Sequence, residues 1–189
     1  MSGRPKAVVN ASRSNWERVF AEAVRRELHE LVDFDEAGIP DRMSEELLRE
    51  QAAGAEVMLS TWGVTRITAG VLDVCPRLRY VIHGAGSVKG FCSDELAARG
   101  IRVFSAVHLN ARPVAEFCLG MILASLKNVF SYKRIFLERG PAAWWGERED
   151  FHGGYYRKNI GLIGYGAISR YLLELLRPFT SAFTLRRVT

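Results

Sequence analysis

The 189-residue sequence predicts an α/β fold built on a parallel β-sheet. Two observations lead to this fold class. First, short apolar runs alternate with segments in which apolar residues recur every three or four positions, as strands and amphipathic helices require. Second, the run at residues 160–163 passes directly into a glycine turn and then a helix. Strands that alternate with helices are joined by crossovers, so neighbouring strands are expected to run parallel.

The predicted elements follow one another closely along the first hundred residues. A capping box at Ser14-Asn-Trp-Glu17 is expected to start one amphipathic helix that reaches Leu28. Ser44 is the expected N-cap of a second helix, which Gly54 ends. Strands are predicted at residues 6–10, 31–34, 57–61, 80–82 and 101–104, and further helices at residues 69–74 and from Ser93 or Asp94 to Gly100.

A single long helix is predicted from Pro113 to about Glu138, with proline in its first turn. Its apolar residues lie nearly all round, so we expect burial on several sides; they are Val114, Phe117, Cys118, Leu119, Met121, Ile122 and Leu126. Gly140-Pro141 ends the helix, and a domain boundary is expected near residue 140. The aromatic segment at 144–158 is interpreted as packing and hinge residues rather than a base-stacking platform, because it carries as many acidic as basic residues.

Composition argues against several classes of function. The chain is 48% hydrophobic and 25% charged, which is typical of a soluble globular protein. Its net charge of +5 is spread along the chain and does not favour nucleic-acid binding. Cys75, Cys92 and Cys118 form no CxxC pair, so we expect no metal site, no disulfide framework, and reduced thiols in a cytoplasmic protein. The longest apolar stretch, Phe117–Leu126, is too short to span a membrane.

The glycine turn after residues 160–163 is the strongest functional signal. Gly164 allows a tight turn, and Gly166 allows the backbone to approach a pyrophosphate without a Cβ in the way. The helix expected at 167–176 would then direct its free N–H groups at the phosphates. Ser169 stands where the third glycine of a G-x-G-x-x-G motif is usual. We favour nucleotide binding over an ordinary strand–turn–helix because all three parts are in register.

An acidic residue about 20 positions further on usually holds the ribose in such folds, and none is present after Glu174. Arg186 and Arg187 lie near that place instead. Either they favour a 2′-phosphorylated dinucleotide, or the tail reflects a truncation or a shifted reading frame; we prefer the second interpretation.

A second loop, His83-Gly-Ala-Gly-Ser-Val88, follows the strand predicted at 80–82. Successive small residues at a strand end can expose backbone N–H groups that hold a carboxylate or a phosphate. A plain tight loop accounts equally well for this pattern when it is taken alone.

Taken together, these residues resemble the D-isomer-specific 2-hydroxyacid dehydrogenase family from about residue 56 to 179. The resemblance rests on Leu78–Ile82 leading into Gly84–Ser87, on Ala97–Ile101, on Asn110 with Val114–Glu116, on Lys158, and on Gly161–Arg170 followed by Leu175–Phe179. It implies a flavodoxin-like, parallel-sheet substrate domain at 1–112, a long interdomain helix at 113–140, and the start of a Rossmann domain at 141–189. The implied activity is hydride transfer between NAD, or NADP, and a small D-2-hydroxy or 2-keto acid.

The resemblance also implies site residues. Ala85, Gly86 and Ser87 would bind the substrate carboxylate, with Ser87 near the nicotinamide, and Asn110 would lie in the interdomain cleft. The expected pyrophosphate loop consists of Gly164, Tyr165, Gly166, Ala167 and Ile168. Val88-Lys-Gly90 replaces the Gly-Val-Asp of many members, which leaves the substrate open.

The family's catalytic Arg, Glu and His would fall beyond residue 189, and none of the four histidines here matches the acid–base role. We therefore expect the chain to be inactive alone, with an exposed sheet edge at 160–163 and weak folding or self-association of residues 141–189. A homodimer is expected of the intact family. The alternatives are a non-catalytic nucleotide-binding or interaction protein of the same fold and, ranked lower, a methyltransferase.

Overall fold

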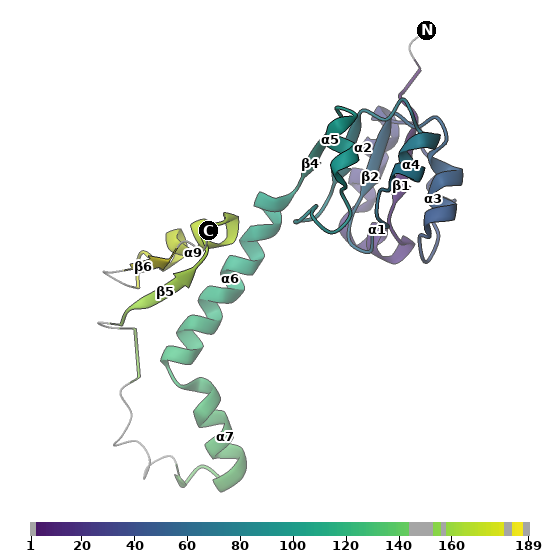
Figure 1. Cartoon of the computed structure of the whole chain (residues 1–189). Coiled ribbons are helices and arrows are strands. Elements are labelled where there is room, and N and C mark those ends of the chain that lie inside the picture. Colours follow the sequence, from purple (N-terminus) through teal and green to yellow (C-terminus); the bar gives the residue numbers. More distant parts are fainter. Residues whose placement is uncertain (1–2, 144–152, 156–157, 180–182, 187–189) are drawn as a thin grey trace. The chain divides into compact units, whose positions relative to one another are not determined.

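The structure of the protein is a computed structural model that describes residues 3–143, 153–155, 158–179 and 183–186, the last range by its backbone (Figure 1). The chain divides into two compact units, Met1–Val107 (unit 1) and His108–Thr189 (unit 2).

Unit 1 contains a four-stranded parallel sheet in the order β1-β2-β3-β4 (Figure 1). The strands are β1 (Ala7–Asn10), β2 (Val57–Ser60), β3 (Tyr80–His83) and β4 (Arg102–Ser105). Every neighbouring pair is parallel. The structure thus confirms the predicted fold class, and four of the predicted strands lie within two residues of their expected bounds.

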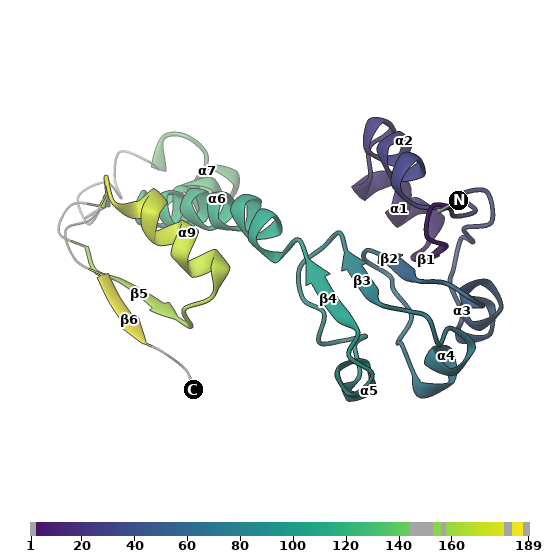
Figure 2. The same ribbon diagram turned by 90° about the horizontal axis from the view of Figure 1, so that it is seen from above.

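Helices cover both faces of this sheet (Figure 2). One face carries α1 (Arg13–Val19) and α2 (Glu22–Leu31), and the other carries α3 (Glu45–Ala52), α4 (Ala69–Val74) and α5 (Asp94–Ala98). Alternate strand residues face opposite sides. Val8 and Met58 therefore join the core under α3, α4 and α5, whereas Val9 and Leu59 join the core that contains Trp16 of α1.

The start of unit 1 differs from the prediction in three ways. Ser12, not Ser14, is the N-cap, because its hydroxyl accepts from Asn15 N–H. The expected single helix is two, separated at Phe20, whose extended backbone (φ −103°, ψ 101°) places its ring 4.4 Å from that of Trp16. The predicted strand at 31–34 is only the isolated bridge Lys6↔Asp33, because α2 continues to Leu31.

Glu36, in the segment after α2, makes polar contacts with both α1 and α2. Its carboxylate lies 2.5 Å from Arg25 Nη1 and 2.9 Å from His29 Nε2, and it accepts from Trp16 Nε1 at 3.1 Å. Burial raises the pKa of Glu36, but these hydrogen bonds outweigh burial and hold the pKa below its usual range. The carboxylate therefore stays charged at neutral pH.

Unit 2 contains all but the first residue of α6 (Val107–Leu126), together with α7 (Val129–Arg139), β5 (Ile160–Ile163), α9 (Ala167–Leu176) and β6 (Phe183–Arg186). The expected strand–turn–helix is present, and β6 pairs with β5 in parallel. Leu172 and Leu176 of α9 pack with Ala115 of α6 in a small core. Within the described residues, β5 has a partner on one edge only, as predicted.

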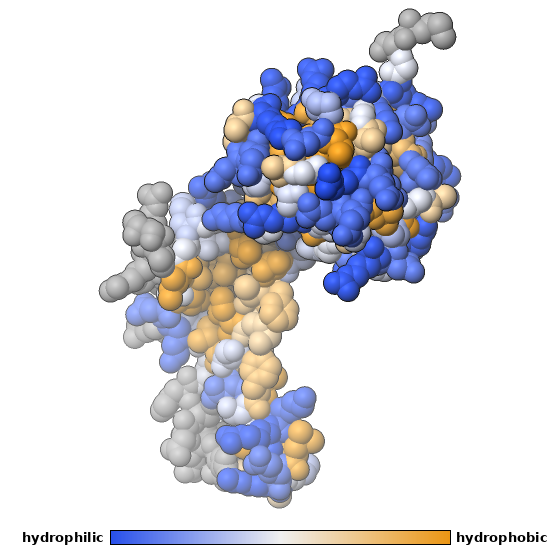
Figure 3. Space-filling view, turned by 45° about the vertical axis from the view of Figure 1, so that its right-hand side comes forward, coloured by the Kyte–Doolittle hydropathy of each residue, from blue (hydrophilic) through white to orange (hydrophobic). Residues whose placement is uncertain are grey.

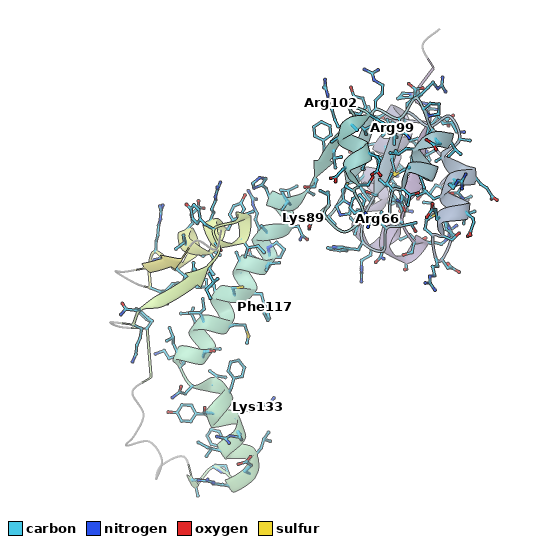
Figure 4. All side chains as sticks on the ribbon, in the orientation of Figure 1. Arg66, Lys89, Arg99, Arg102, Phe117 and Lys133 are labelled. Atoms are coloured by element: carbon cyan, nitrogen blue, oxygen red, sulfur yellow. The ribbon has the colours of Figure 1, made fainter. Side chains whose placement is uncertain are left out.

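The prediction of one long helix from Pro113 to about Glu138 is wrong. The observed helix α6 begins at Val107, contains Pro113 in its interior, and ends at Leu126. Asn128 then adopts a left-handed conformation (φ 54°), which breaks the helix before α7. The expected burial on several sides is not found, because Phe117 is 67% exposed and apolar side chains gather on the surface of α6 (Figures 3 and 4). Most of the aromatic segment at 144–158 lies outside the described residues; Tyr155 makes an edge contact with Phe179.

By length and composition alone, α6 could cross a membrane, because its 20 residues include an 18-residue window with a mean hydropathy of 1.2. The stretch Phe117–Leu126 is only the second half of this helix and by itself is still too short to span a membrane, so the expectation is not contradicted. Arg112 and Glu116 lie on this helix, and Ala115, Leu119 and Ile122 pack against α9 and β5. Such contacts are those of a core helix in a folded domain.

Candidate active site

Polar residues end the strands of unit 1 in one continuous row. Asn10, Ser60, His83 and Ser105 are the last residues of β1 to β4, and the register places each beside the next. Asn10, Ser60 and His83 are buried. In open α/β sheets, ligands bind outside the carboxyl ends of the strands. A ligand is therefore expected at this end of the sheet.

Asn10 holds the loop that follows β2. Its Nδ2 donates to Thr65 C=O at 2.8 Å, and its Oδ1 accepts from Thr65 N–H at 2.9 Å. Two residues later, Ile67 N–H donates to Phe91 C=O at 2.9 Å, which joins this loop to the one that follows β3. The two loops at this end of the sheet are therefore fixed to one another and to β1.

His83 forms the floor beneath the loop that follows β3. Its Nδ1 lies 3.0 Å from Ser60 Oγ, and its ring lies 4.7 Å from that of Phe91. Burial lowers the pKa of His83, so the imidazole is neutral at physiological pH. The hydroxyl of Thr61 is also buried here and has no hydrogen-bond partner among the described residues.

The loop Ala85–Gly86–Ser87 presents unpaired backbone donors. None of its three N–H groups donates a hydrogen bond to any described part of the chain. Gly84 precedes the loop, and a Cβ there would lie 2.6 Å from Phe20 Cζ, so only glycine fits without a shift. Arg66 and Lys89 lie on the two loops at this end (Figure 4). Free amides on a loop that also carries Lys89 form a favourable environment for an anion such as a carboxylate.

A second set of free donors occurs in unit 2. Gly164 adopts φ +92°, a conformation that favours glycine, and Gly166 is the N-cap of α9. A Cβ on either glycine would meet no atom within 4 Å. The N–H groups of Ala167, Ile168 and Ser169 have no partner in the described structure, as expected in a first helical turn. The turn is thus open and leads into a helix whose first N–H groups are free to bind an anionic group such as a phosphate.

The predicted site residues fall into both units. Ala85, Gly86 and Ser87 share one loop of unit 1, with Ala85 buried and Ser87 exposed. Gly164, Tyr165, Gly166, Ala167 and Ile168 share one turn of unit 2, where the Tyr165 ring is 48% exposed and the Arg170 guanidinium lies over it at 5.1 Å. Asn110 lies half-buried in α6. Its expected position in a cleft between domains stays a prediction.

Sequence reasoning missed Asn10, Ser60 and Thr61. Each ends or directly follows an apolar strand, and a polar residue at that position was the signal available in the sequence. His83 belongs to the loop that the sequence singled out, and its side chain is buried.

Comparison with known proteins identifies the family. The model of the D-isomer specific 2-hydroxyacid dehydrogenase catalytic domain matches residues 11–188. The chain belongs to this family. It is 27% identical to D-3-phosphoglycerate dehydrogenase of Methanocaldococcus jannaschii over 150 residues, and 29% identical to glyoxylate reductase of Thermococcus kodakarensis over 119 residues. These matches cover 79% and 60% of this chain but only 28% and 35% of the relatives.

Solved structures agree with this assignment. A protein from Pyrococcus horikoshii superposes with a TM-score of 0.71 and 25% identity over 97% of this chain and 51% of its own. The chain thus spans about half the length of that relative. Two more distant structures share the fold: an NADPH-dependent glyoxylate/hydroxypyruvate reductase from Sinorhizobium meliloti and an NAD⁺-bound 3-phosphoglycerate dehydrogenase from Entamoeba histolytica, at 19% and 16% identity.

Proposed function

We propose that the protein takes part in hydride transfer between a nicotinamide dinucleotide and a small D-2-hydroxy or 2-keto acid. The observation that carries this proposal is the open glycine turn of unit 2. Gly164 has the required left-handed backbone, Gly166 leaves room for phosphate oxygens, and the first N–H groups of α9 have no partner in the described chain. These are the properties that a pyrophosphate requires of a protein.

The residues of the turn fit the cofactor in a definite way. Gly164, Tyr165 and Gly166 would bring the backbone to the pyrophosphate, and Ala167 and Ile168 would donate their N–H groups from the positive end of the α9 dipole. The nicotinamide supplies or accepts the hydride when it is bound. Relatives of both cofactor types share the fold, and Arg187 lies outside the described residues, so the proposal covers NAD and NADP alike.

The substrate carboxylate would bind to the free N–H groups of Ala85, Gly86 and Ser87. The neutral His83 beneath the loop adds no charge, while Arg66 and Lys89 at the rim attract an anion. Ser87 is the only one of the three that brings a hydroxyl, and its Oγ accepts from Lys89 N–H at 3.4 Å. We propose Asn110 as a further substrate contact and Ser87 as a contact of the nicotinamide.

The proposed division of labour follows from these elements. Residues 1–112 would form the substrate domain, 113–140 the connecting helices, and 141–189 the beginning of the cofactor domain. We further propose that the intact protein is a homodimer, as the resemblance implies.

The test measures binding and turnover separately. The purified 189-residue chain is titrated with NADH by nicotinamide fluorescence and then, with oxalate as the carboxylate probe, by NMR at the Gly86 and Ser87 amides. We expect saturable NADH binding and oxalate-induced shifts at both amides. Gly166→Val, which fills open space without a positive φ, should weaken NADH binding at least tenfold. Gly161→Ala, also open but within β5, is the matched control and should bind as the wild type does.

Turnover is assayed in the same preparation with NADH and a panel of 2-keto acids. Binding without turnover agrees with the expectation that the 189 residues do not catalyse alone, and it also fits a non-catalytic nucleotide-binding protein. Clear turnover refutes that expectation and supports the oxidoreductase directly. Failure of NADH to bind, or equal binding by Gly166→Val, removes the basis of the proposal.

A further inference from the structure

The outer edge of β1 has unpaired backbone groups. β1 is the last strand of the unit 1 sheet on this side, and α3 lies beside it (Figures 1 and 2). In a parallel ladder, successive residues direct their backbone groups to opposite edges. Lys6 C=O accepts from Glu56 N–H, so Lys6 faces β2, whereas Ala7 N–H donates to Asp33 C=O and faces outward. Val9, two residues further on, therefore also faces outward.

The outer pairing stops after a single bridge, Lys6↔Asp33. Beyond it, the C=O of Ala7 and both backbone groups of Val9 have no hydrogen-bond partner in the described ranges of the chain. Val9 as a whole residue is only 4% exposed, and Ala7 and Val9 line a cavity beside this edge. Unpaired polar backbone in such a position is costly, and an added strand would satisfy all three groups.

A cavity of about 440 Å³ lies along this edge. Its lining consists of Lys6, Ala7, Val8, Val9, Asp33, Phe34, Asp35, Glu50 and Gln51. The volume falls within the range of about 300–1,000 Å³ that is usual for ligand pockets. Apolar walls come from β1 and Phe34, and polar rims come from the segment after the bridge and from α3. The cavity therefore has apolar surface for alternate side chains and backbone groups for main-chain pairing.

The charge of the cavity selects the partner. Three of its four charged residues are carboxylates, namely Asp33, Asp35 and Glu50, and all three are exposed. The single cation, Lys6, donates through Nζ to Ala53 C=O at 2.6 Å. An acidic rim beside an open strand edge favours a basic segment and disfavours an acidic one.

We propose that this edge binds an extended, basic peptide segment of a partner protein, which adds to the sheet as a further strand beside β1. The pairing supplies the main-chain hydrogen bonds that Ala7 and Val9 lack, and lysine or arginine side chains contact Asp35 and Glu50. This is strand addition, in which backbone pairing gives affinity and side-chain contacts give specificity. The interaction goes beyond the proposed oxidoreductase function and uses none of its residues.

The experiment uses the full 189-residue chain and a defined probe, the capped heptapeptide Ser-Val-Lys-Val-Lys-Val-Ser labelled with fluorescein. Anisotropy measures binding, and NMR follows the Val9 amide. We expect saturable binding with a shift and slowed exchange at Val9 N–H. The same peptide with N-methyl groups on alternate amides should bind at least tenfold more weakly, because it cannot pair. The analogue in which glutamate replaces both lysines should also bind at least tenfold more weakly, because the rim of the cavity is acidic.

Two variants test the charge argument without altering the fold. Asp35→Asn combined with Glu50→Gln should weaken the lysine peptide at least threefold, and asparagine can still accept from Gly38 N–H as Asp35 does. Glu46→Gln, on the same helix but outside the cavity, should bind as the wild type does. Absence of saturable binding, or equal affinity for the N-methylated peptide, overturns the proposal. The proposal is also overturned if the chain self-associates, with a shift at the Val9 amide, and added peptide does not reverse this association. That result would assign the edge to a second copy of the chain.

Discussion

Removing the Asn10 side chain tests how the carboxyl end of the unit 1 sheet is held together. Asn10→Ala deletes the two hydrogen bonds to Thr65, at 2.8 and 2.9 Å, from a side chain that is fully buried. Each such bond contributes a net ~0.5–1.5 kcal/mol. The N–H and C=O of Thr65 then lose their partner in a partly buried place, which adds to the cost. We expect a total loss of about 2–4 kcal/mol in the free energy of unfolding.

The assay is urea unfolding followed by far-UV circular dichroism, together with hydrogen exchange of the Thr65 amide. Asn10→Ala should lower the urea midpoint without changing the slope, and Thr65 N–H should exchange faster. Asn159→Ala, the same chemical change at an exposed position of unit 2, serves as the control and should shift the midpoint little. If Asn10→Ala retains both the midpoint and the protection of Thr65, the loop is held by other contacts and the reasoning is wrong.

Four further predictions concern single side chains. Thr61→Val should raise the free energy of unfolding by about 0.5–1.5 kcal/mol, because the buried Thr61 hydroxyl has no hydrogen-bond partner in the described structure. If urea unfolding instead shows a loss of stability, the hydroxyl does have a hydrogen-bond partner. Burial lowers the pKa of His83, so the unfolded chain binds more protons between that pKa and about 6.5. Stability should therefore be full above pH 6.5 and fall as the pH drops below it, and His83→Gln should flatten this dependence in unfolding titrations from pH 7.5 to 5.5. Gly164→Ala should cost unit 2 about 1–2 kcal/mol, because alanine disfavours φ +92°; an unchanged thermal midpoint would show that the turn relaxes. Ser12→Ala should lower the free energy of unfolding by about 1 kcal/mol in urea, whereas Ser14→Ala should change it very little, because Ser12 is the N-cap of α1. A larger loss for Ser14→Ala would show that Ser14 is the N-cap instead.

Prediction from sequence succeeded where the deciding information is local. Short apolar runs located β1 to β4, and Ser44 is the observed N-cap of α3, its hydroxyl accepting from Leu47 N–H. The glycine turn was located for the same reason, since Gly164 and Gly166 are needed by the backbone itself. Such signals require no knowledge of distant residues.

Prediction failed where a helix extends past its local signals and where the partner of a residue is distant in the sequence. Residues 31–34 have the composition of a strand, yet α2 continues to Leu31 and leaves only Asp33 to meet Lys6. Pro113 suggested a helix start, but α6 already begins at Val107. The two hydrogen bonds of the buried Asn10 side chain could not be predicted, because their partner, Thr65, is 55 residues away in the sequence.

The sequence by itself determined the order of strands and helices, the parallel sheet, the glycine turn and the family, because each follows from residue types within a short window. Only the tertiary structure decided which polar groups have partners. It pairs Asn10 with Thr65 and His83 with Ser60, while the N–H groups of Ala85–Ser87, the C=O of Ala7 and the backbone groups of Val9 have no partner in the described chain. Hydrogen bonding between distant residues depends on how the elements pack, and the polar groups that packing leaves unpaired are the ones that can bind a ligand.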